Sequence, residues 1–389
     1  MASMVLDEHR ELLADAIRIR AYEAALKEAV KPDDVVLDLG AGTGILGLLA
    51  ARGGARRVYA VDDGGMLQLA RDIARANHVG DRITHIHGSS TQIDLPEKAD
   101  VVVADQIGPF GFEAGIVRCF SDARARLLKR GGLTVPSTLD LVVAPVTASD
   151  VWERIEFWRS SPAGFDLTPT HLVAMNTGYC VQLKAPQLLG PPSTLARLDL
   201  AVDVPPLVQA DTTLTMDRPG LLHGIGGWFS AQLSPHVSMT SSPLVADRIQ
   251  RSNVVFPIGT PVALPKGARV CVAMTIAIEP LIVSWRVHVD QANGAHEAVF
   301  AHSTWRGALI TAEDLHRMRH DGRPRLSPWG AAIGVGALRR RPQRRRDREA
   351  ASRTASDAVS VAGGRGALRV RGPDVVFHLG PGREYGCHV

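Results

Sequence analysis

The residue types best suited to chemistry form a glycine-rich stretch at residues 38–44, with the sequence DLGAGTG. Glycine lets the backbone turn sharply and approach a ligand more closely than a Cβ atom would permit. A dinucleotide-binding loop has the spacing G-x-G-x-x-G, but Ile45 stands at the position of its third glycine. The glycines here are Gly40, Gly42 and Gly44, preceded by Asp38. This spacing favours S-adenosyl-L-methionine as the ligand over NAD or FAD.

Asp62 could supply the carboxylate that such a ligand needs for its ribose. It ends the next apolar run, RVYAVD, twenty residues after Gly42, where a carboxylate can accept both ribose hydroxyls. Asp63 is the alternative at this position. The glycines could also form only a tight turn, with Asp62 as a helix cap, but the order of strand, glycines, helix, strand and acid indicates a cofactor site. The expected site comprises Asp38, Gly40, Gly42, Gly44 and Asp62.

Strands and helices alternate around this stretch. The runs VVLDLG, RVYAVD, ITHIHG and ADVVVAD have the length and apolar content of buried strands, and segments with helical spacing separate them. This alternation predicts a Rossmann-like, doubly wound α/β domain over residues 31–135, preceded by a helical segment at residues 1–30. Ligands bind at the carboxyl ends of the strands in such a sheet, and the glycine stretch and Asp62 stand at two of these ends.

The pattern changes after residue 135. Short alternating segments such as LDLVVAPV, ARVCVAMTI and IVSWRVHV are separated by Pro, Gly and Asp, which predicts an antiparallel β-barrel-like domain over residues 136–315. One helical excursion is expected near residues 150–160, where Val151, Trp152, Ile155 and Trp158 share a face.

Charge is distributed unevenly along the 389 residues. Lys and Arg number 44 against 40 Asp and Glu, but residues 316–389 contain sixteen Arg, no Lys and six acidic residues. Because this segment has almost no apolar periodicity, we expect an Arg-rich disordered tail.

Cysteine spacing and the N-terminal residues give two further expectations. The four cysteines lie far apart without a C-x-x-C pair, so no metal site is expected. The N-terminal MASMVLDEHR is acidic where a signal peptide is basic, and no run of eighteen apolar residues occurs. We therefore expect a cytoplasmic protein that has no membrane partner.

Three segments resemble the protein arginine N-methyltransferase family: HRELLADAIRIRAY, VVLDLGAGTGILGLLAARGGARRVYAVD and GGLTVPSTLDLVVAPV. The resemblance covers about residues 6–312. It implies a class I S-adenosylmethionine-dependent methyltransferase with a helical lid over the cofactor and a dimerisation arm near residues 150–190. It further implies that Arg18, in the same lid as His9, pairs with the cofactor carboxylate, and that Ser90 and Thr91 flank the adenine.

The family's acceptor loop follows the fourth strand and carries two glutamates that bind the substrate guanidinium. In this chain the loop reads ADQIGPFGFE, and Asp105 and Glu113 are its two acids. Two carboxylates suit a planar guanidinium because they orient it by paired hydrogen bonds. The loop departs from the family pattern, since the first acid is Asp and the separation is eight residues rather than nine.

A second departure concerns a Thr-His-Trp segment that packs against this loop in the family. The corresponding stretch here reads ADRIQRSNVVFPI and lacks the triplet. The local match HSTW at residues 302–305 lies some fifty residues later, and we expect it to be a strand and turn in which His302 and Trp305 are structural.

Three functions are open on these observations. The resemblance implies methyl transfer to a nitrogen of an arginine or other guanidino group, with Asp105 and Glu113 as catalytic residues. The departures leave room for a small-molecule N- or O-methyltransferase acting on a natural product or metabolite. The third function is a non-catalytic cofactor-binding protein tethered to nucleic acid by its basic tail.

The expected partners follow from the same observations. They are a protein, peptide or small-molecule methyl acceptor and, as the resemblance implies, a second copy of the chain. Trp152 and Trp158 would either contact that copy or lie in the core. Nucleic acid is expected only through the tail.

Overall fold

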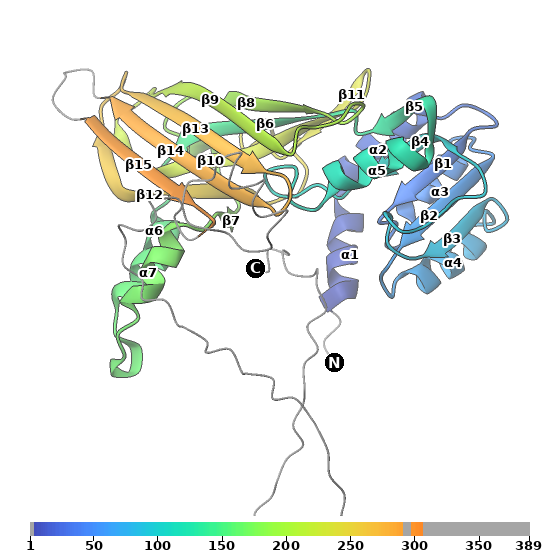
Figure 1. Ribbon diagram of the computed structural model, residues 1–389, viewed down its shortest axis with the longest axis horizontal. Coiled ribbons are helices and arrows are strands. Elements are labelled where there is room, and N and C mark those ends of the chain that lie inside the picture. The colour runs from blue at the N-terminus through green and yellow to red at the C-terminus, as the bar shows by residue number, and fades with distance from the viewer. Residues whose placement is uncertain (1–3, 291–296, 306–389) are drawn as a thin grey trace, which may run out of the picture. The chain divides into compact units, whose positions relative to one another are not determined.

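Strand β1 (Val35–Leu39) is buried at every position, which is typical of a central strand in a sheet covered on both faces. In the computed structural model, which describes residues 4–290 and 297–305, it is the middle strand of a parallel sheet with the order β3-β2-β1-β4-β5 (Figure 1). The other strands are β2 (Arg57–Asp62), β3 (Ile83–His87), β4 (Ala99–Ala104) and β5 (Leu128–Val135). The strand order reverses between β1 and β4, and ligands bind at such a switch point.

Five helices accompany this sheet within the described residues. They are α1 (Met4–Ala14), α2 (Ala16–Ala29), α3 (Ile45–Arg52), α4 (Leu67–Ala76) and α5 (Ile116–Arg126). Helix α3 follows the glycine stretch directly and contacts β1 and β2, whereas α5 contacts β4 and β5. The doubly wound α/β arrangement predicted from the alternation of strands and helices is confirmed.

The second half of the chain is antiparallel, as predicted. One sheet has the order β7-β12-β10-β6-β8, with β11 beside β10, and the other has the order β15-β14-β13-β9. Contacts of β8 with β9 and of β12 with β15 bring the two sheets together along both edges, which gives a barrel-like arrangement. The strands are β6 (Thr138–Val146), β7 (Tyr179–Val181), β8 (Ser193–Asp199), β9 (Leu207–Thr215), β10 (Gly220–Ser234), β11 (Val237–Thr240), β12 (Asn253–Leu264), β13 (Arg269–Ala277), β14 (Ile282–Asp290) and β15 (Glu297–Ser303).

The helical excursion between β6 and β7 is longer than its apolar periodicity indicated. Helix α6 (Ser149–Glu156) and a 3-10 turn, Phe157–Arg159, match the expectation, but a second helix, α7 (Thr168–Met175), follows. Its sequence TPTHLVAM has no apolar stripe, and only His171 and Ala174 are buried in it. Helix α7 packs on α6 and on the 3-10 turn, so tertiary contacts explain a helix that the pattern did not reveal.

Residue His302 has the structural role expected of it. It lies in β15 with its side chain buried, and its ring stacks on Trp285 at a centroid distance of 5.4 Å. Burial lowers the pKa of His302 to about 4, so the ring is neutral at physiological pH.

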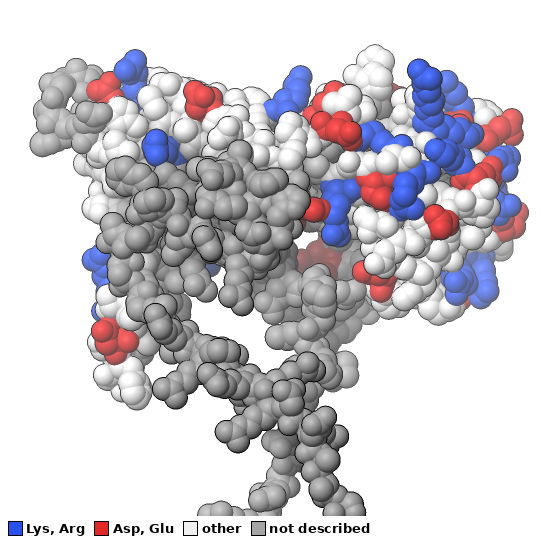
Figure 2. Space-filling model, viewed as in Figure 1, with Lys and Arg blue, Asp and Glu red and all other residues white. Residues whose placement is uncertain are grey.

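Charged side chains of both signs lie on the surface of the parallel-sheet half. On the face shown in Figure 2, basic and acidic side chains are interspersed there. No helix among the described residues is long and apolar enough to cross a membrane. The Arg-rich tail predicted for residues 316–389 lies outside the described residues.

Candidate active site

The glycine stretch forms a tight turn from β1 into α3. Gly40, Gly42 and Gly44 have φ angles of +69°, +53° and +81°, in the left-handed region that side chains rarely adopt. A Cβ atom on Gly42 would lie 2.6 Å from His9 Cε1, and one on Gly40 would lie 2.5 Å from Gln106 Nε2. Helix α1 and the segment after β4 therefore both pack closely against the glycine turn.

Asp38 and Asp62 stand beside this turn on neighbouring strands. Asp38 is completely buried, and its Oδ2 accepts the Gly47 N–H at 2.8 Å, while Oδ1 has no hydrogen-bond partner among the described residues. The pKa of Asp38 is raised to about 7. Burial is the main cause and the negative charge of Asp62 adds to it, while the hydrogen bond from the Gly47 N–H acts in the opposite direction. Asp62 is joined to the turn, because its Oδ2 accepts the Gly42 N–H at 2.8 Å.

These residues fit an adenosyl cofactor. The backbone of the turn lacks Cβ atoms, so that His9 and Gln106 approach Gly42 and Gly40 closely, and Oδ1 of Asp38, which has no partner among the described residues, is a buried acceptor on the strand that leads into the turn. The two carboxylate oxygens of Asp62 accept the N–H groups of Gly42 and Gly64, and each retains a lone pair that could accept a ribose hydroxyl.

Ser90 and Thr91 lie after β3, at the same edge of the parallel sheet. The Ser90 hydroxyl is 3.2 Å from the Cys119 thiol of α5, and the Thr91 hydroxyl is 3.2 Å from the Ser89 hydroxyl. Both residues are half-buried. Their side-chain hydrogen bonds therefore connect them to their own loop and to α5 rather than to the glycine turn.

Arg18 is buried and bound to Asp105. Its Nε donates to Asp105 Oδ2 at 2.5 Å, and its Nη1 donates to the Leu12 carbonyl at 2.7 Å. The Tyr22 hydroxyl lies 3.0 Å from Asp105 Oδ1. Burial, and then the charge of Asp105, raise the pKa of Tyr22 well above its usual value of 10, so the phenol remains a donor. The arginine that the resemblance assigns to the cofactor carboxylate thus already has a carboxylate partner from the acceptor loop.

A second arginine reaches Asp105 from the antiparallel half of the chain. Arg251 Nη2 lies 3.1 Å from Asp105 Oδ2, and the two side chains are 21% and 8% exposed. Next to it, the Gln250 N–H donates to Asp15 Oδ2 at 2.6 Å, while Asp15 Oδ1 accepts the Arg18 N–H. Asp15 therefore caps α2 and joins it to the segment before β12.

Glu113 turns back onto its own loop. Its Oε1 accepts the Phe110 N–H at 2.9 Å, and its Oε2, packed against Gly108, is buried with no hydrogen-bond partner among the described residues. Burial raises the pKa of Glu113 to about 7, although backbone N–H groups of the loop lower it. Glu113 is therefore an acid that can change its protonation state near neutral pH.

Four residues that pattern reasoning passed over belong to this site. Asp15 could have been recognised as a helix cap, because an aspartate precedes the predicted helix. No local signal marks Tyr22, Gln106 or Arg251, and Arg251 is 146 residues away from Asp105 in the chain.

The sequence is similar to known methyltransferases. A family model described as ribosomal protein L11 methyltransferase (PrmA) matches residues 20–139. Protein arginine N-methyltransferase 6 of Xenopus tropicalis is 32% identical over 246 residues, which are 60% of this chain and 72% of that protein. Protein arginine N-methyltransferase 1 of Schizosaccharomyces pombe is 32% identical over 243 residues, 58% of this chain and 68% of that protein.

Solved structures share the fold. The Trypanosoma brucei PRMT1 enzyme-prozyme heterotetrameric complex with AdoHcy matches with a TM-score of 0.67 and 23% identity, over 76% of this chain and 97% of that one. Arabidopsis thaliana protein arginine methyltransferase 10 matches with a TM-score of 0.65 and 23% identity, over 77% and 97%. With the sequence identity to the Xenopus relative over most of its length, these findings confirm the resemblance: the chain belongs to the protein arginine N-methyltransferase family, whose members are S-adenosylmethionine-dependent methyltransferases.

Proposed function

We propose that this protein transfers a methyl group from S-adenosylmethionine to a guanidino nitrogen of an arginine in a protein or peptide. The observation that carries the proposal is the acceptor loop at the switch point, residues 104–113, which we also call the acidic loop. In it Gln106 packs on the glycine turn, and Asp105 already binds two guanidinium groups of the chain itself. The same carboxylate chemistry would recognise an acceptor arginine beside the cofactor.

The cofactor would lie against the glycine turn. The Asp62 carboxylate would hold the ribose, and His9 and Gln106 would enclose the turn on two sides. Bound there, S-adenosylmethionine would supply an electrophilic methyl group on a sulfonium centre. The residues of this chain then have to orient the acceptor nitrogen in line with it and exclude water, which supplies most of the rate enhancement in such a displacement.

Asp105 and Glu113 would orient the acceptor. A guanidinium brought next to Glu113 favours the charged carboxylate, since an opposite charge lowers the pKa that burial has raised. The buried Oε2 would then gain the hydrogen bond that it lacks within the described residues. The carboxylate would draw positive charge away from the attacking nitrogen and could take up the proton that leaves it.

Replacing Glu113 with Gln tests this role. We expect Glu113→Gln to lower kcat by at least about a hundredfold, because the variant cannot carry the negative charge at the acceptor. Affinity for the cofactor should stay within a few fold. The assay follows labelled methyl groups into the protein and small-molecule fractions of a cell extract, with methylated residues identified by mass.

Asp94 provides a matched control. Its carboxylate is 98% exposed and pairs with Arg126 on the surface, so Asp94→Asn should leave transfer unchanged. Full activity of the Glu113→Gln variant would contradict the assigned role.

A small-molecule acceptor is the second candidate, favoured by the departures of the acceptor loop, whose first acid is Asp and whose two acids are eight residues apart. Label that appears only in a metabolite fraction, with none in protein, would establish this alternative. The tethering of a non-catalytic protein to nucleic acid depends on residues outside the described ranges, and a cytoplasmic location stays a prediction.

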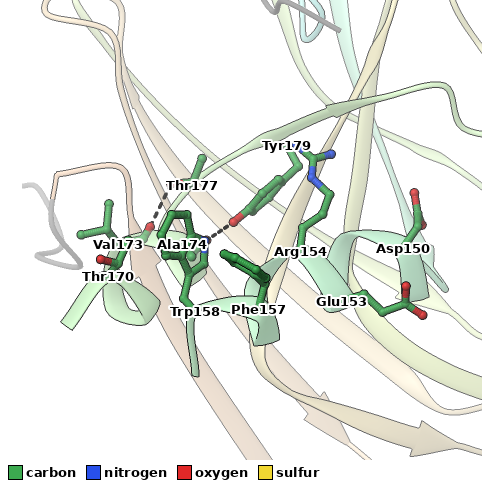
Figure 3. A pocket seen from close by; sticks show the side chains of 10 residues that line it. All are labelled: Asp150, Glu153, Arg154, Phe157, Trp158, Thr170, Val173, Ala174, Thr177 and Tyr179. Carbon is green, nitrogen blue, oxygen red and sulfur yellow. Dashed lines mark hydrogen bonds between the residues drawn. The ribbon is translucent and has the colours of Figure 1, made fainter. Parts of the chain in front are cut away.

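We further propose that the chain forms a homodimer through the arm predicted near residues 150–190, of which residues 149–181, from α6 to β7, are called the arm from here on. A groove of about 640 Å³ lies in this arm, where Phe157, Trp158 and Val173 line it and Arg154 extends over the Tyr179 ring (Figure 3). Apolar side chains are also exposed on helices of the parallel-sheet half, at Leu6, Leu13 and Leu69. Two unlike apolar surfaces on one chain suit a head-to-tail contact with a second copy.

A further inference from the structure

The Arg251 guanidinium lies at a carboxylate that the proposed acceptor would need. Its Nη2 is 3.1 Å from Asp105 Oδ2, and Asp105 belongs to the loop that we propose to bind an acceptor arginine. Oδ2 of Asp105 could accept a hydrogen bond from a substrate guanidinium. In this structure it accepts one from the guanidinium of Arg251 instead.

Hydrogen bonds of nearby residues hold the chain on both sides of Arg251. On one side, the Gln250 N–H donates to Asp15 Oδ2 at 2.6 Å. On the other, buried Asn253 accepts the Leu183 N–H at 3.0 Å through its side-chain oxygen. Because these contacts join different elements of the fold, they present Arg251 to the acidic loop in a defined position.

Arg251 is the more displaceable of the two arginines on Asp105. Arg18 is 5% exposed and has a second hydrogen bond to the Leu12 carbonyl, whereas Arg251 is 21% exposed. If Arg251 moved into solvent, Arg18 would still compensate the charge of Asp105. The Arg251 contact can therefore be exchanged for an incoming guanidinium without leaving a buried carboxylate unpaired.

We propose that Arg251 is a specificity-determining residue that competes with the acceptor guanidinium for Asp105. This inference rests on the proposed function. A free guanidino compound has few other contacts with which to displace Arg251, whereas an arginine within a polypeptide can use binding free energy from its neighbouring residues. Arg251 thereby selects arginine in a polypeptide over free arginine and other small guanidines.

The test compares Arg251→Gln with the unmodified protein. Nα-acetylarginine methylamide serves as a small acceptor, and its equilibrium binding is measured by calorimetry in the presence of S-adenosylhomocysteine. We expect the Arg251→Gln variant to bind this compound about tenfold more tightly, which is the change expected when one charge-assisted hydrogen bond no longer has to be displaced. Its KM for the compound should fall while kcat stays within about twofold.

Two further variants separate competition from structural effects. Arg248→Gln is the matched control, because Arg248 donates to the Leu183 carbonyl instead of to the acidic loop, and it should leave affinity unchanged. Arg251→Lys keeps the charge but loses the guanidinium fork, so its affinity for the small acceptor should fall between those of the unmodified protein and Arg251→Gln. Unchanged cofactor affinity in all three variants shows that the site is folded.

The outcomes distinguish this inference from the proposed function. Equal or weaker binding of the small acceptor by Arg251→Gln, or no binding by either protein, overturns the inference. If protein arginine in an extract is still methylated in that case, the proposed function stands without it. Tighter binding by Arg251→Gln with label found in no arginine of any acceptor would support the competition and overturn the proposed function.

Discussion

At the scale of single residues, three buried carboxylates of the site differ in what surrounds them. Asp38 and Glu113 each have one buried oxygen without a hydrogen-bond partner among the described residues, and burial raises both pKa values to about 7. Asp105 is also buried but faces two guanidinium groups. Burial alone disfavours the charged form of a carboxyl group, whereas a nearby opposite charge favours that form. Glu113 is therefore the acid in the acceptor loop that is suited to gaining and losing a proton.

The pH dependence of the free energy of unfolding should reveal the raised pKa of Asp38. Its pKa is raised in the folded protein from about 3.8, so its protonated form stabilises the fold fully below pH 3.8, and this stability is lost as the pH rises through 7. In Asp38→Asn this loss disappears, and the free energy of unfolding relative to the unmodified protein should rise by about 2 to 3 kcal/mol between pH 5 and pH 8.

Urea unfolding at the two pH values measures this difference. The cost of placing an amide beside Gly47 is the same at both values and cancels. A stability difference between the two proteins that does not change with pH would show that Asp38 is already ionised in the folded protein.

At the scale of elements, the Asp15 carboxylate joins the first helices to the antiparallel half. One oxygen caps α2 and the other accepts a backbone N–H from the segment before β12. A second connection runs from α2 to the end of β10, where Ser234 donates to Glu28 Oε2 at 2.6 Å. Helix α2 thus fixes the position of Arg251 relative to the acidic loop.

Removal of the Asp15 carboxylate should destabilise the protein measurably. We expect Asp15→Ala to lower the free energy of unfolding by about 2 to 3 kcal/mol, because it removes a helix cap and leaves the Gln250 N–H unpaired. Denaturant unfolding gives the value. Asp166→Ala is the control, since exposed Asp166 accepts an N–H only within its own turn, and its cost should stay below about 1 kcal/mol. Equal costs for the two variants would contradict a role of Asp15 in joining the two halves.

At the scale of the whole molecule, the arm at residues 149–181 has exposed aromatic side chains that suit the proposed homodimer contact. Phe157 is 51% exposed and contacts the Trp158 ring edge to face. Large aromatic side chains left on a surface are typical of contact sites with a partner. The proposed contact with a second copy would explain why Trp152 and Trp158 are only partly buried within one copy of the chain.

A charge introduced into the arm should dissociate the proposed dimer. We expect Phe157→Asp to raise the dimer dissociation constant by at least about thirtyfold, since an interface aromatic typically contributes 2 kcal/mol or more. Sedimentation velocity at several concentrations measures it. Val299→Asp, at an exposed position on β15, is the control and should leave the dimer intact. A monomeric unmodified protein, or a Phe157→Asp dimer of unchanged affinity, would refute the arm as the contact.

The sequence alone was enough to predict the alternating α/β sheet, the antiparallel second half and the glycine turn with Asp38 and Asp62. Each of these depends on the periodicity of apolar residues or on the short-range spacing of glycines, which a linear pattern records. Family resemblance in short segments assigned Arg18 to the cofactor carboxylate, and Asp105 and Glu113 to the acceptor guanidinium. The α7 helix escaped prediction because packing, rather than its own periodicity, stabilises it.

Only the tertiary structure decided what each charged group faces. It brings Arg251 and Tyr22 to Asp105 and joins Asp15 to Gln250, over separations of 146, 83 and 235 residues. It also buries the Oε2 of Glu113 with no partner among the described residues. Hydrogen bonding, burial and pKa depend on distance in space, and the folding of the antiparallel half onto α2 sets those distances.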